Sequence, residues 1–325
     1  SWESATVRVL IVRLSPFQDV DRSMAHLLLF SECRRAAPKG FIDLAFFPDP
    51  SERRQLSASR SPWFRGLASG RPVTDFDLVL VSNAFALELL NLPHLFSSAG
   101  LPLFASERRR AGIQRPLVIL GGSNAQVAGA IVRPDGDSFV DGLFFGEGEG
   151  AVADLVGILA DTRTASADRL AQAASVTGFW AAGSEPKARK RILHPVAAAL
   201  PPSDYPILNS GESATARLQI TYGCPAFCSF CLQGWERKPY REVPLAQILE
   251  SARTLKRQTG ANTLEVFSYN FNMHSGVFSL LLELNRIFRH VNFMSQRADI
   301  LARTPGLLRA ELAAGKRSFT LGIEG

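Results

Sequence analysis

Three cysteines fall within eight consecutive positions, at Cys224, Cys228 and Cys231. The stretch 216–222 before them is rich in strand-forming residues, so the three thiols share one loop at the carboxyl end of a predicted strand. Thiolates gathered in this way bind soft metals. The fourth cysteine, Cys33, stands alone and is typical of a small core residue. Such cysteine usage excludes a secreted disulfide framework and indicates a metal site in a reducing compartment.

Two kinds of metal site are compatible with three thiolates. A closed zinc site needs four ligands, and because there is no second cysteine pair, the fourth would have to be His194, His274 or His290. A 4Fe-4S cubane held by three cysteines leaves one iron open to a small chelating molecule. We expect the cluster, and a structural zinc site is the alternative.

The segment 224–231, in which Phe230 directly precedes the last cysteine, resembles the C-x-x-x-C-x-aromatic-C motif of the radical S-adenosylmethionine superfamily. The resemblance implies a 4Fe-4S cluster on the three cysteines, with the amino and carboxylate groups of S-adenosylmethionine on the open iron. Reduction of the cluster then yields a 5′-deoxyadenosyl radical that abstracts hydrogen. The cofactors carry this chemistry while the protein positions them. A reductant such as flavodoxin or ferredoxin is the implied partner.

Two later segments extend the resemblance. Residues 295–301 resemble the end of the family's third barrel strand, and residues 321–325 resemble the end of the fourth strand in its cobalamin-linked branch. Together with Phe230, the side chains of Arg297 and Glu324 are therefore candidate contacts of S-adenosylmethionine.

The second strand of the predicted barrel departs from the family pattern. Residues 266–272 replace the Gly-Gly-Glu that commonly holds the methionine amino group. Ser268 and Asn270 are substitutes for it by position only, and a surface loop is the alternative.

The N-terminal half alternates apolar strands with helical stretches. Near-continuous apolar strands are typical of a parallel sheet covered on both faces, so we expect a doubly wound, Rossmann-like α/β domain. The predicted strands are 7–12, 41–47, 76–81, 116–120 and 141–145, and the predicted helices are 23–36, 86–96 and 150–159.

The loops after these strands carry a second candidate site. With its LGGSNA and GEGEG segments, the domain resembles the cobalamin-binding domain fused to many radical enzymes, which implies contacts from Ser82, Gly121, Gly122, Gly146 and Glu147. The alternative is that these glycines only form tight turns, since no G-x-G-x-x-G follows the first strand. No D-x-H-x-x-G is present, so bound cobalamin would lack the histidine ligand. If cobalamin binds, the implied reaction is methylation of an unactivated carbon or phosphorus.

We divide the chain into a cobalamin-binding-like domain at 1–165, a linker at 166–212 and a radical S-adenosylmethionine core at 213–325. The core repeats strand and helix, which predicts a partial (β/α) barrel. It offers fewer units than the family's barrel, so we expect the chain to be a fragment that lacks later strands.

Two other functions remain open. The methylthiotransferase branch of the family modifies tRNA and pairs an α/β domain with the same barrel, but that domain contributes three cysteines where this one has Cys33. The other alternative is a non-catalytic module braced by zinc or by an iron–sulfur cluster. The substrate could be a small molecule, a peptide or a nucleic acid.

The amino-acid composition does not decide between these functions. The chain has 36 Lys and Arg and 30 Asp and Glu, which gives a net charge of +6. Charged residues on solvated helix faces explain this excess as readily as nucleic-acid binding does. No run of the roughly 18 apolar residues that would cross a bilayer is present, so no membrane span is expected and we expect a cytoplasmic protein.

Overall fold

The computed structural model describes residues 1–325 except 22, 186–187, 203, 208–209 and 323–325. The chain forms two compact parts, Ser1–Ile192 and Leu193–Gly325, called unit 1 and unit 2 below. Their boundary falls inside the stretch 166–212 that the sequence predicts to be a linker. Part of that stretch belongs to unit 1, because strand β6 (Phe179–Ala181) pairs with the unit 1 sheet.

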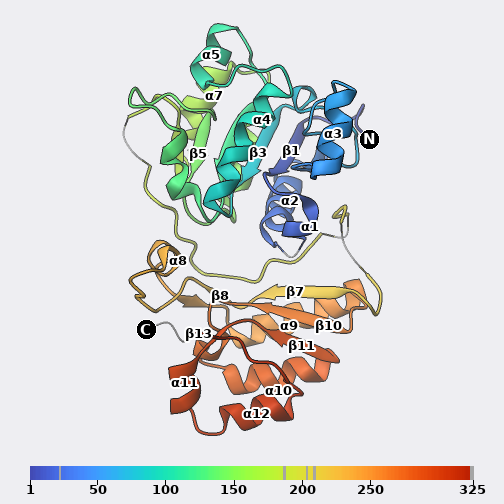
Figure 1. Cartoon of the computed structure of the whole chain (residues 1–325), viewed down its shortest axis with the longest axis vertical. Helices are drawn as coiled ribbons and strands as arrows, with labels where there is room; N and C mark the ends of the chain where they lie inside the picture. Colours follow the sequence, from blue (N-terminus) through green and yellow to red (C-terminus); the bar gives the residue numbers. More distant parts are fainter. Residues whose placement is uncertain (22, 186–187, 203, 208–209, 323–325) are drawn as a thin grey trace. The chain divides into compact units, whose positions relative to one another are not determined.

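Unit 1 is built on a six-stranded sheet in the order β2-β1-β3-β4-β5-β6 (Figure 1). All pairings are parallel except that of β5 with the edge strand β6. The order from β2 to β5 is flavodoxin-like, and sheets of this order bind ligands beyond their carboxyl ends. The other strands are β1 (Arg8–Arg13), β2 (Phe41–Phe46), β3 (Leu78–Ser82), β4 (Leu117–Gly121) and β5 (Gly142–Phe144).

Helices connect these strands as the predicted fold class requires, and helix α2 packs on β1, β2 and α6. The helix predicted at 86–96 is instead two segments, η2 and α4, because Pro93 in the first turn of α4 cannot donate a hydrogen bond to a continuous helix. The helices are α1 (Phe17–Val20), α2 (Ala25–Ala36), α3 (Pro50–Ala58), α4 (Leu92–Ser97), α5 (Ala105–Arg110), α6 (Ala151–Leu159) and α7 (Ser166–Ala173), and the 3₁₀ segments are η1 (Val73–Asp75), η2 (Ala86–Asn91) and η3 (Ala125–Ile131).

A buried ion pair lies at the carboxyl ends of β1 and β3. The Arg13 guanidinium stands 3.3 Å from Glu88, and the two side chains are only 1% and 3% exposed. Glu88 also accepts hydrogen bonds from the Ser15 hydroxyl at 2.6 Å and the Asn83 amide at 3.1 Å. Burial lowers the pKa of Arg13, and the neighbouring Glu88 carboxylate opposes that change. A buried polar network centred on Glu88 thus lies at the carboxyl ends of β1 and β3.

Unit 2 alternates strand and helix in the predicted order. Strands β7, β10 and β11 form a parallel sheet. The pairs β8–β9 and β12–β13 form two separate, two-stranded sheets. The described strands are β7 (Thr215–Gln219), β8 (Thr221–Tyr222), β9 (Arg241–Glu242), β10 (Thr263–Phe267), β11 (His290–Phe293), β12 (Gln296–Arg297) and β13 (Leu321–Gly322). The described helices are α8 (Leu232–Glu236), α9 (Leu245–Thr259), α10 (Val277–Ile287), α11 (Ala298–Arg303) and α12 (Leu307–Ala313), with the 3₁₀ segment η4 (Phe271–Met273).

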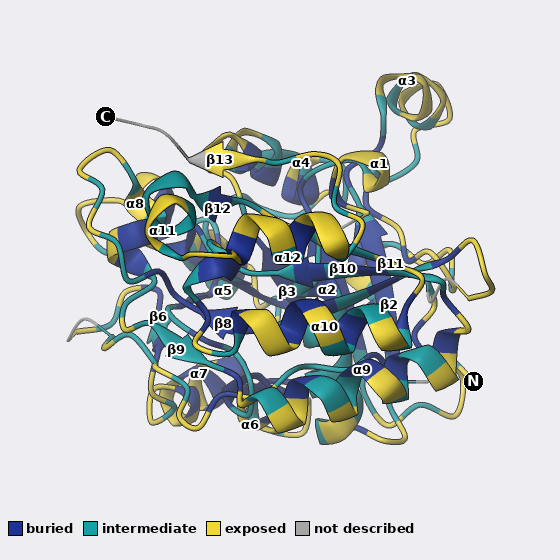
Figure 2. Cartoon of the chain, turned by 90° about the horizontal axis from the view of Figure 1, so that it is seen from below, coloured by how far each residue is buried: buried dark blue, intermediate teal, exposed yellow. Residues whose placement is uncertain are grey.

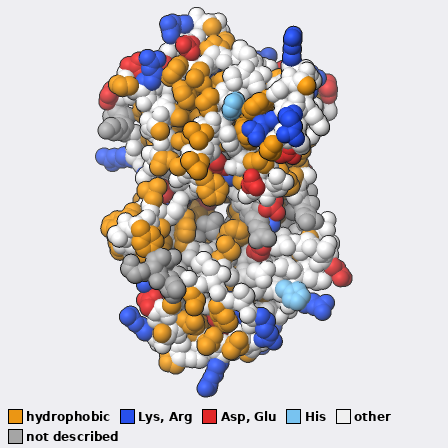
Figure 3. Space-filling model, in the orientation of Figure 1, with side chains coloured by type: hydrophobic (Ala, Val, Ile, Leu, Met, Phe, Trp, Pro, Cys, Tyr) orange, Lys and Arg blue, Asp and Glu red, His pale blue; other side chains and the backbone are white. Residues whose placement is uncertain are grey.

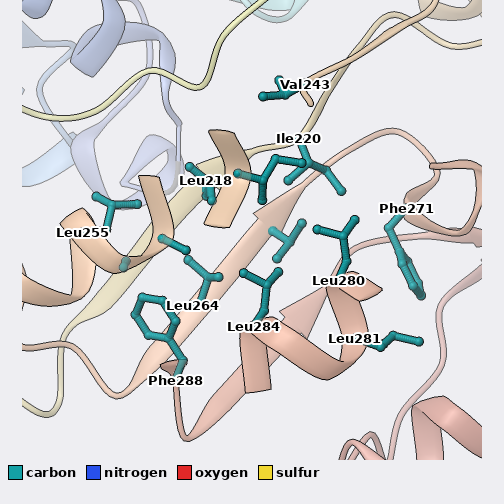
Figure 4. Packing of buried hydrophobic residues seen from close by; sticks show 14 of the residues in the cluster. Leu218, Ile220, Val243, Leu255, Leu264, Phe271, Leu280, Leu281, Leu284 and Phe288 are labelled. Atoms are coloured by element: carbon teal, nitrogen blue, oxygen red, sulfur yellow. The ribbon is translucent and has the colours of Figure 1, made fainter. Parts of the chain in front are cut away.

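The core of unit 2 lies between its sheet and the helices α9 and α10. Leucines of the strands and helices point toward one another there, among them Leu218, Leu264, Leu280 and Leu284 (Figure 4). Both helices turn an exposed stripe away from the sheet (Figure 2). Burial of one helical face against a sheet is what the sequence periodicity predicts, and the alternating parallel architecture confirms the predicted fold class.

The surface carries no single basic stripe on the face shown in Figure 3, where Lys and Arg side chains are scattered among other types. Among the described helices, none is both long and apolar enough to cross a bilayer.

Candidate functional site

The cysteine loop, residues 223–231, connects strand β8 to helix α8. Cys224 is buried, while Cys228 and Cys231 are half-buried. The loop is closed by a hydrogen bond from the Cys231 amide to the Cys228 carbonyl at 3.1 Å. Asn270 and Arg297, which come from later in the chain, follow the parallel strands β10 and β11, so their segments lie at the same edge of the sheet as the loop.

Gly223 sets the direction in which the loop leaves its strand. Its φ is +73°, in the left-handed region. A Cβ atom at this position would lie 2.1 Å from the Arg237 carbonyl oxygen and 2.7 Å from that of Pro239. Only glycine allows the backbone of the loop to pass this close to the segment after α8.

Gly223→Ala is therefore expected to displace the cysteine loop and reduce its capacity for iron. The left-handed conformation alone costs about 1–3 kcal/mol for a residue with a Cβ, and the clash adds to it. Gly306→Ala is the matched control, because Gly306 has a φ of +83° but open space around its Cβ position. Iron content after anaerobic reconstitution should fall for the first variant only. Equal losses in both variants would show that the Arg237 contact is unimportant.

Nitrogen donors lie beside the cysteine sulfurs. The Asn270 amide donates to Cys224 Sγ at 3.5 Å, and the Gly234 backbone donates to Cys231 Sγ at 3.3 Å. Near the third sulfur, the pKa of Arg297 is raised, first by its hydrogen bond to Asp299 at 2.8 Å and further by the Cys228 thiol. N–H groups directed at sulfur stabilise thiolates, which are the ligating form of cysteine.

Aromatic side chains line the exposed side of the loop. Trp235 donates from Nε1 to the Cys228 carbonyl at 2.9 Å, and its ring meets Phe227 edge to face at 5.1 Å. Phe227 and Phe230 are 65% and 62% exposed. Trp235 thus packs over the cysteine loop.

Only some of the residues predicted to contact S-adenosylmethionine lie beside the cysteine sulfurs. The Ser268 hydroxyl pairs with that of Thr221 at 2.7 Å, which ties the end of β10 to β8. Asn270 and Arg297 approach the cysteine sulfurs, and Phe230 faces outward. Glu324 lies outside the described residues.

The donor set of the loop fits an iron–sulfur cluster. A cubane binds each thiolate at a different iron, so its ligands surround a cluster instead of converging on one ion. Within the described part of the chain, no three His, Cys, Asp or Glu side chains are arranged to hold a metal ion. Three thiolates on one loop with N–H groups beside them supply the ligand type and local charge that a cluster needs.

The histidines proposed for a zinc site have other surroundings. His274 is buried, its Nδ1 accepts from the Gly276 amide at 2.9 Å, and its Nε2 lies 3.2 Å from the Val243 carbonyl. His290 begins strand β11 and so lies at the opposite end of the sheet from the cysteine loop. His194 is exposed. The positions and hydrogen bonds of His274 and His290 therefore disfavour them as the fourth ligand of a zinc site.

In unit 1 the predicted ligand residues do lie along one edge of the sheet. Ser82 is opposite Gly121 at the carboxyl ends of β3 and β4. However, Ser82 is only 2% exposed, and its hydroxyl accepts from Arg13 at 3.4 Å. Gly122 has a φ of +109°, and a Cβ there would meet the Asn83 carbonyl oxygen at 2.3 Å. Close packing of two backbone segments explains this glycine without a ligand.

The turn after β5 is held by a residue near the end of unit 1. Arg191 pairs with Gly146 as a short parallel bridge, and its guanidinium donates to the Glu147 carbonyl at 3.0 Å and to the Glu149 carbonyl. A Cβ on Gly146 would lie 2.1 Å from the Arg191 carbonyl oxygen. Glu147 is largely buried in this arrangement. The sequence did not single out Arg191, because 45 positions separate it from Gly146.

Known proteins match the chain in both sequence and structure. Residues 29–181 match the family model for the N-terminal part of radical SAM proteins. Over 68 residues, the chain is 34% identical to the tRNA-2-methylthio-N(6)-dimethylallyladenosine synthase of Fusobacterium nucleatum, an alignment that covers 21% of this chain and 15% of that protein.

Two solved structures share the fold over 98% of this chain. One is the radical S-adenosylmethionine methyltransferase TsrM of Kitasatospora setae, with a TM-score of 0.55 and 14% identity. The other is the cobalamin-dependent S-adenosylmethionine radical enzyme OxsB, with a TM-score of 0.58 and 13% identity. The matches cover 59% of the TsrM chain and 44% of the OxsB chain, so this sequence spans about half the length of these relatives. The three-cysteine motif, the family match over residues 29–181 and this fold make the chain similar to proteins of the radical S-adenosylmethionine superfamily.

Proposed function

We propose that Cys224, Cys228 and Cys231 hold a 4Fe-4S cluster with which the protein cleaves S-adenosylmethionine reductively. The observation that carries this proposal is the loop itself, with three thiols at one edge of a parallel sheet and N–H groups directed at two sulfurs. When bound, the cluster and S-adenosylmethionine supply a 5′-deoxyadenosyl radical. The match of residues 29–181 to the N-terminal part of radical SAM proteins supports the proposal, and flavodoxin or ferredoxin is the proposed electron donor.

The protein's own residues would bind and orient these groups. Asn270 donates to Cys224 Sγ and Arg297 stands near Cys228, so both segments border the loop where S-adenosylmethionine would have to reach the open iron. The Arg297 guanidinium suits the carboxylate of the methionine moiety. Ser268 fixes the end of β10 through Thr221. Phe230 offers an exposed ring to an apolar or aromatic part of the ligand.

The direct test is the cleavage of S-adenosylmethionine by the anaerobically reconstituted full chain. With dithionite as reductant, we expect 5′-deoxyadenosine and methionine in equal amounts, measured by liquid chromatography and mass spectrometry. Arg297→Gln should weaken binding of S-adenosylmethionine while keeping the iron content. A chain that carries a full cluster but makes no 5′-deoxyadenosine would be a structural iron–sulfur module.

We further propose that unit 1 binds cobalamin and that the reaction is a methyl transfer. The likeness in fold to TsrM, one of whose structures contains cobalamin and a 4Fe-4S cluster, and to OxsB supports this finer assignment. The carboxyl edge that carries Ser82, Gly121, Gly122, Gly146 and Glu147 is the proposed binding edge. When bound, cobalamin supplies the carrier of the methyl group.

Equilibrium dialysis of the full chain against hydroxocobalamin tests this assignment independently of the cluster. We expect about one cobalamin per chain, with a visible spectrum that shows no histidine ligand. Formation of S-adenosylhomocysteine in the presence of cobalamin would support methyl transfer. A chain that retains no cobalamin but still cleaves S-adenosylmethionine would restrict the function to another radical step.

The sequence match to a tRNA methylthiotransferase supports one second candidate. Against it, unit 1 contains one cysteine, Cys33, which is fully buried in the core. Incubation with tRNA followed by nucleoside mass spectrometry separates the two. A methylthio-modified adenosine would favour the second candidate over methyl transfer.

A further inference from the structure

Lys238 reaches back into the cysteine loop from the segment after helix α8. Its ammonium donates to the Cys224 carbonyl at 2.6 Å and to the Ala226 carbonyl at 2.8 Å. The same nitrogen lies 3.7 Å from the centre of the Phe227 ring. Three contacts thus join one half-buried cation to the stretch from Cys224 to Phe227. Charge-assisted hydrogen bonds and close cation–π contacts are stronger than neutral ones.

These contacts affect both the shape of the loop and the charge beside it. Two carbonyls held by one ammonium restrain the backbone from Cys224 to Ala226, the stretch that leads from the first cysteine toward the second. The positive charge lies against the backbone of Cys224. One-electron reduction adds negative charge to a cluster, so a nearby cation favours the reduced form and raises the reduction potential.

We propose that Lys238 is a positioning residue for the cluster, which holds the cysteine loop in its ligating shape and raises the cluster's reduction potential. The proposal rests on the proposed function, since it requires a cluster on the loop. Lys238 belongs neither to the cysteine motif nor to the carboxyl edge of the barrel strands, so neither feature assigns it this role.

The test compares Lys238→Gln, Lys238→Arg and Lys238→Met by redox titration of the reconstituted full chain, followed by electron paramagnetic resonance. At the wild-type midpoint, we expect the ratio of reduced to oxidised cluster to fall about tenfold in Lys238→Gln, which corresponds to about 59 mV for one electron. Lys238→Arg should keep the wild-type ratio, because it retains the charge. Lys238→Met should combine the lower potential with reduced iron content.

Lys256→Gln is the matched control. Lys256 also donates to a backbone carbonyl, that of Ala261 at 2.7 Å, but it does so near the amino end of strand β10. This variant should leave the potential and the iron content unchanged. Wild-type potentials in Lys238→Gln with full iron content would overturn the proposal and leave the cluster assignment intact. A wild-type chain that takes up no cluster would instead overturn the proposed function.

Discussion

Cys228→Ala is expected to abolish the cluster and all cleavage of S-adenosylmethionine. Cys228 is the central cysteine of the loop, its carbonyl accepts from both the Cys231 amide and Trp235, and its thiol faces Arg297. Alanine keeps the backbone contacts and removes only the sulfur. Iron bound after reconstitution should fall from about four atoms per chain to near zero, because two thiolates do not hold a cubane of this kind.

Cys33→Ala is the matched control for the loss of a thiol. Cys33 is fully buried on helix α2 in unit 1, and burial raises its pKa, so it is an inert thiol. Iron content and 5′-deoxyadenosine formation should match the wild type. If Cys33→Ala lost iron as completely as Cys228→Ala, the cluster would not be assigned to the loop of unit 2.

Glu88→Ala is expected to destabilise unit 1 by about 3–5 kcal/mol, because it leaves Arg13 as an unpaired buried charge. Glu88 also accepts from the Ala84 amide at 2.6 Å and from the Asn83 side chain, so several buried donors lose their acceptor. Hydrogen–deuterium exchange of the full chain measures the effect locally. Protection of the β1 and β3 amides should fall by about two to four orders of magnitude.

Two further variants separate charge from packing. The double variant Arg13→Met with Glu88→Met removes both charges and should recover much of the lost protection, since apolar side chains can replace a buried pair. Arg163→Ala removes an ion pair with Asp161 whose arginine is 89% exposed, and it should leave exchange unchanged. Equal exchange in Glu88→Ala and wild type would mean that the buried pair does not hold the carboxyl edge of the sheet together.

The cysteine loop was predictable because its chemistry is local in sequence. Cys224, Cys228 and Cys231 share one loop, and the strand before it follows from residue type and spacing, whereas the short helix α8 after it was not predicted. The five parallel strands of unit 1 were predictable for the same reason, since each is a short apolar run between turns. The antiparallel edge strand β6 was not, because its three residues lie in a stretch without clear periodicity.

Contacts between distant residues could not be predicted. Asn270 was selected by position as a contact of S-adenosylmethionine, and the structure directs its amide toward Cys224, 46 positions away. Nothing in the sequence near Lys238 predicts that its ammonium is bound to carbonyls of the cysteine loop. The sequence likewise does not reveal that Gly223 must be glycine, because the reason is the nearby Arg237 carbonyl, which leaves no room for a Cβ atom.

The central claim is that the loop of unit 2 carries a 4Fe-4S cluster with one iron open to S-adenosylmethionine. The most direct test is electron paramagnetic resonance of the reconstituted, reduced full chain with and without S-adenosylmethionine. We predict the signal of a reduced 4Fe-4S cluster that shifts when S-adenosylmethionine is added and is lost in Cys228→Ala. Zinc in place of iron, or a cluster signal that S-adenosylmethionine leaves unchanged, would contradict the account.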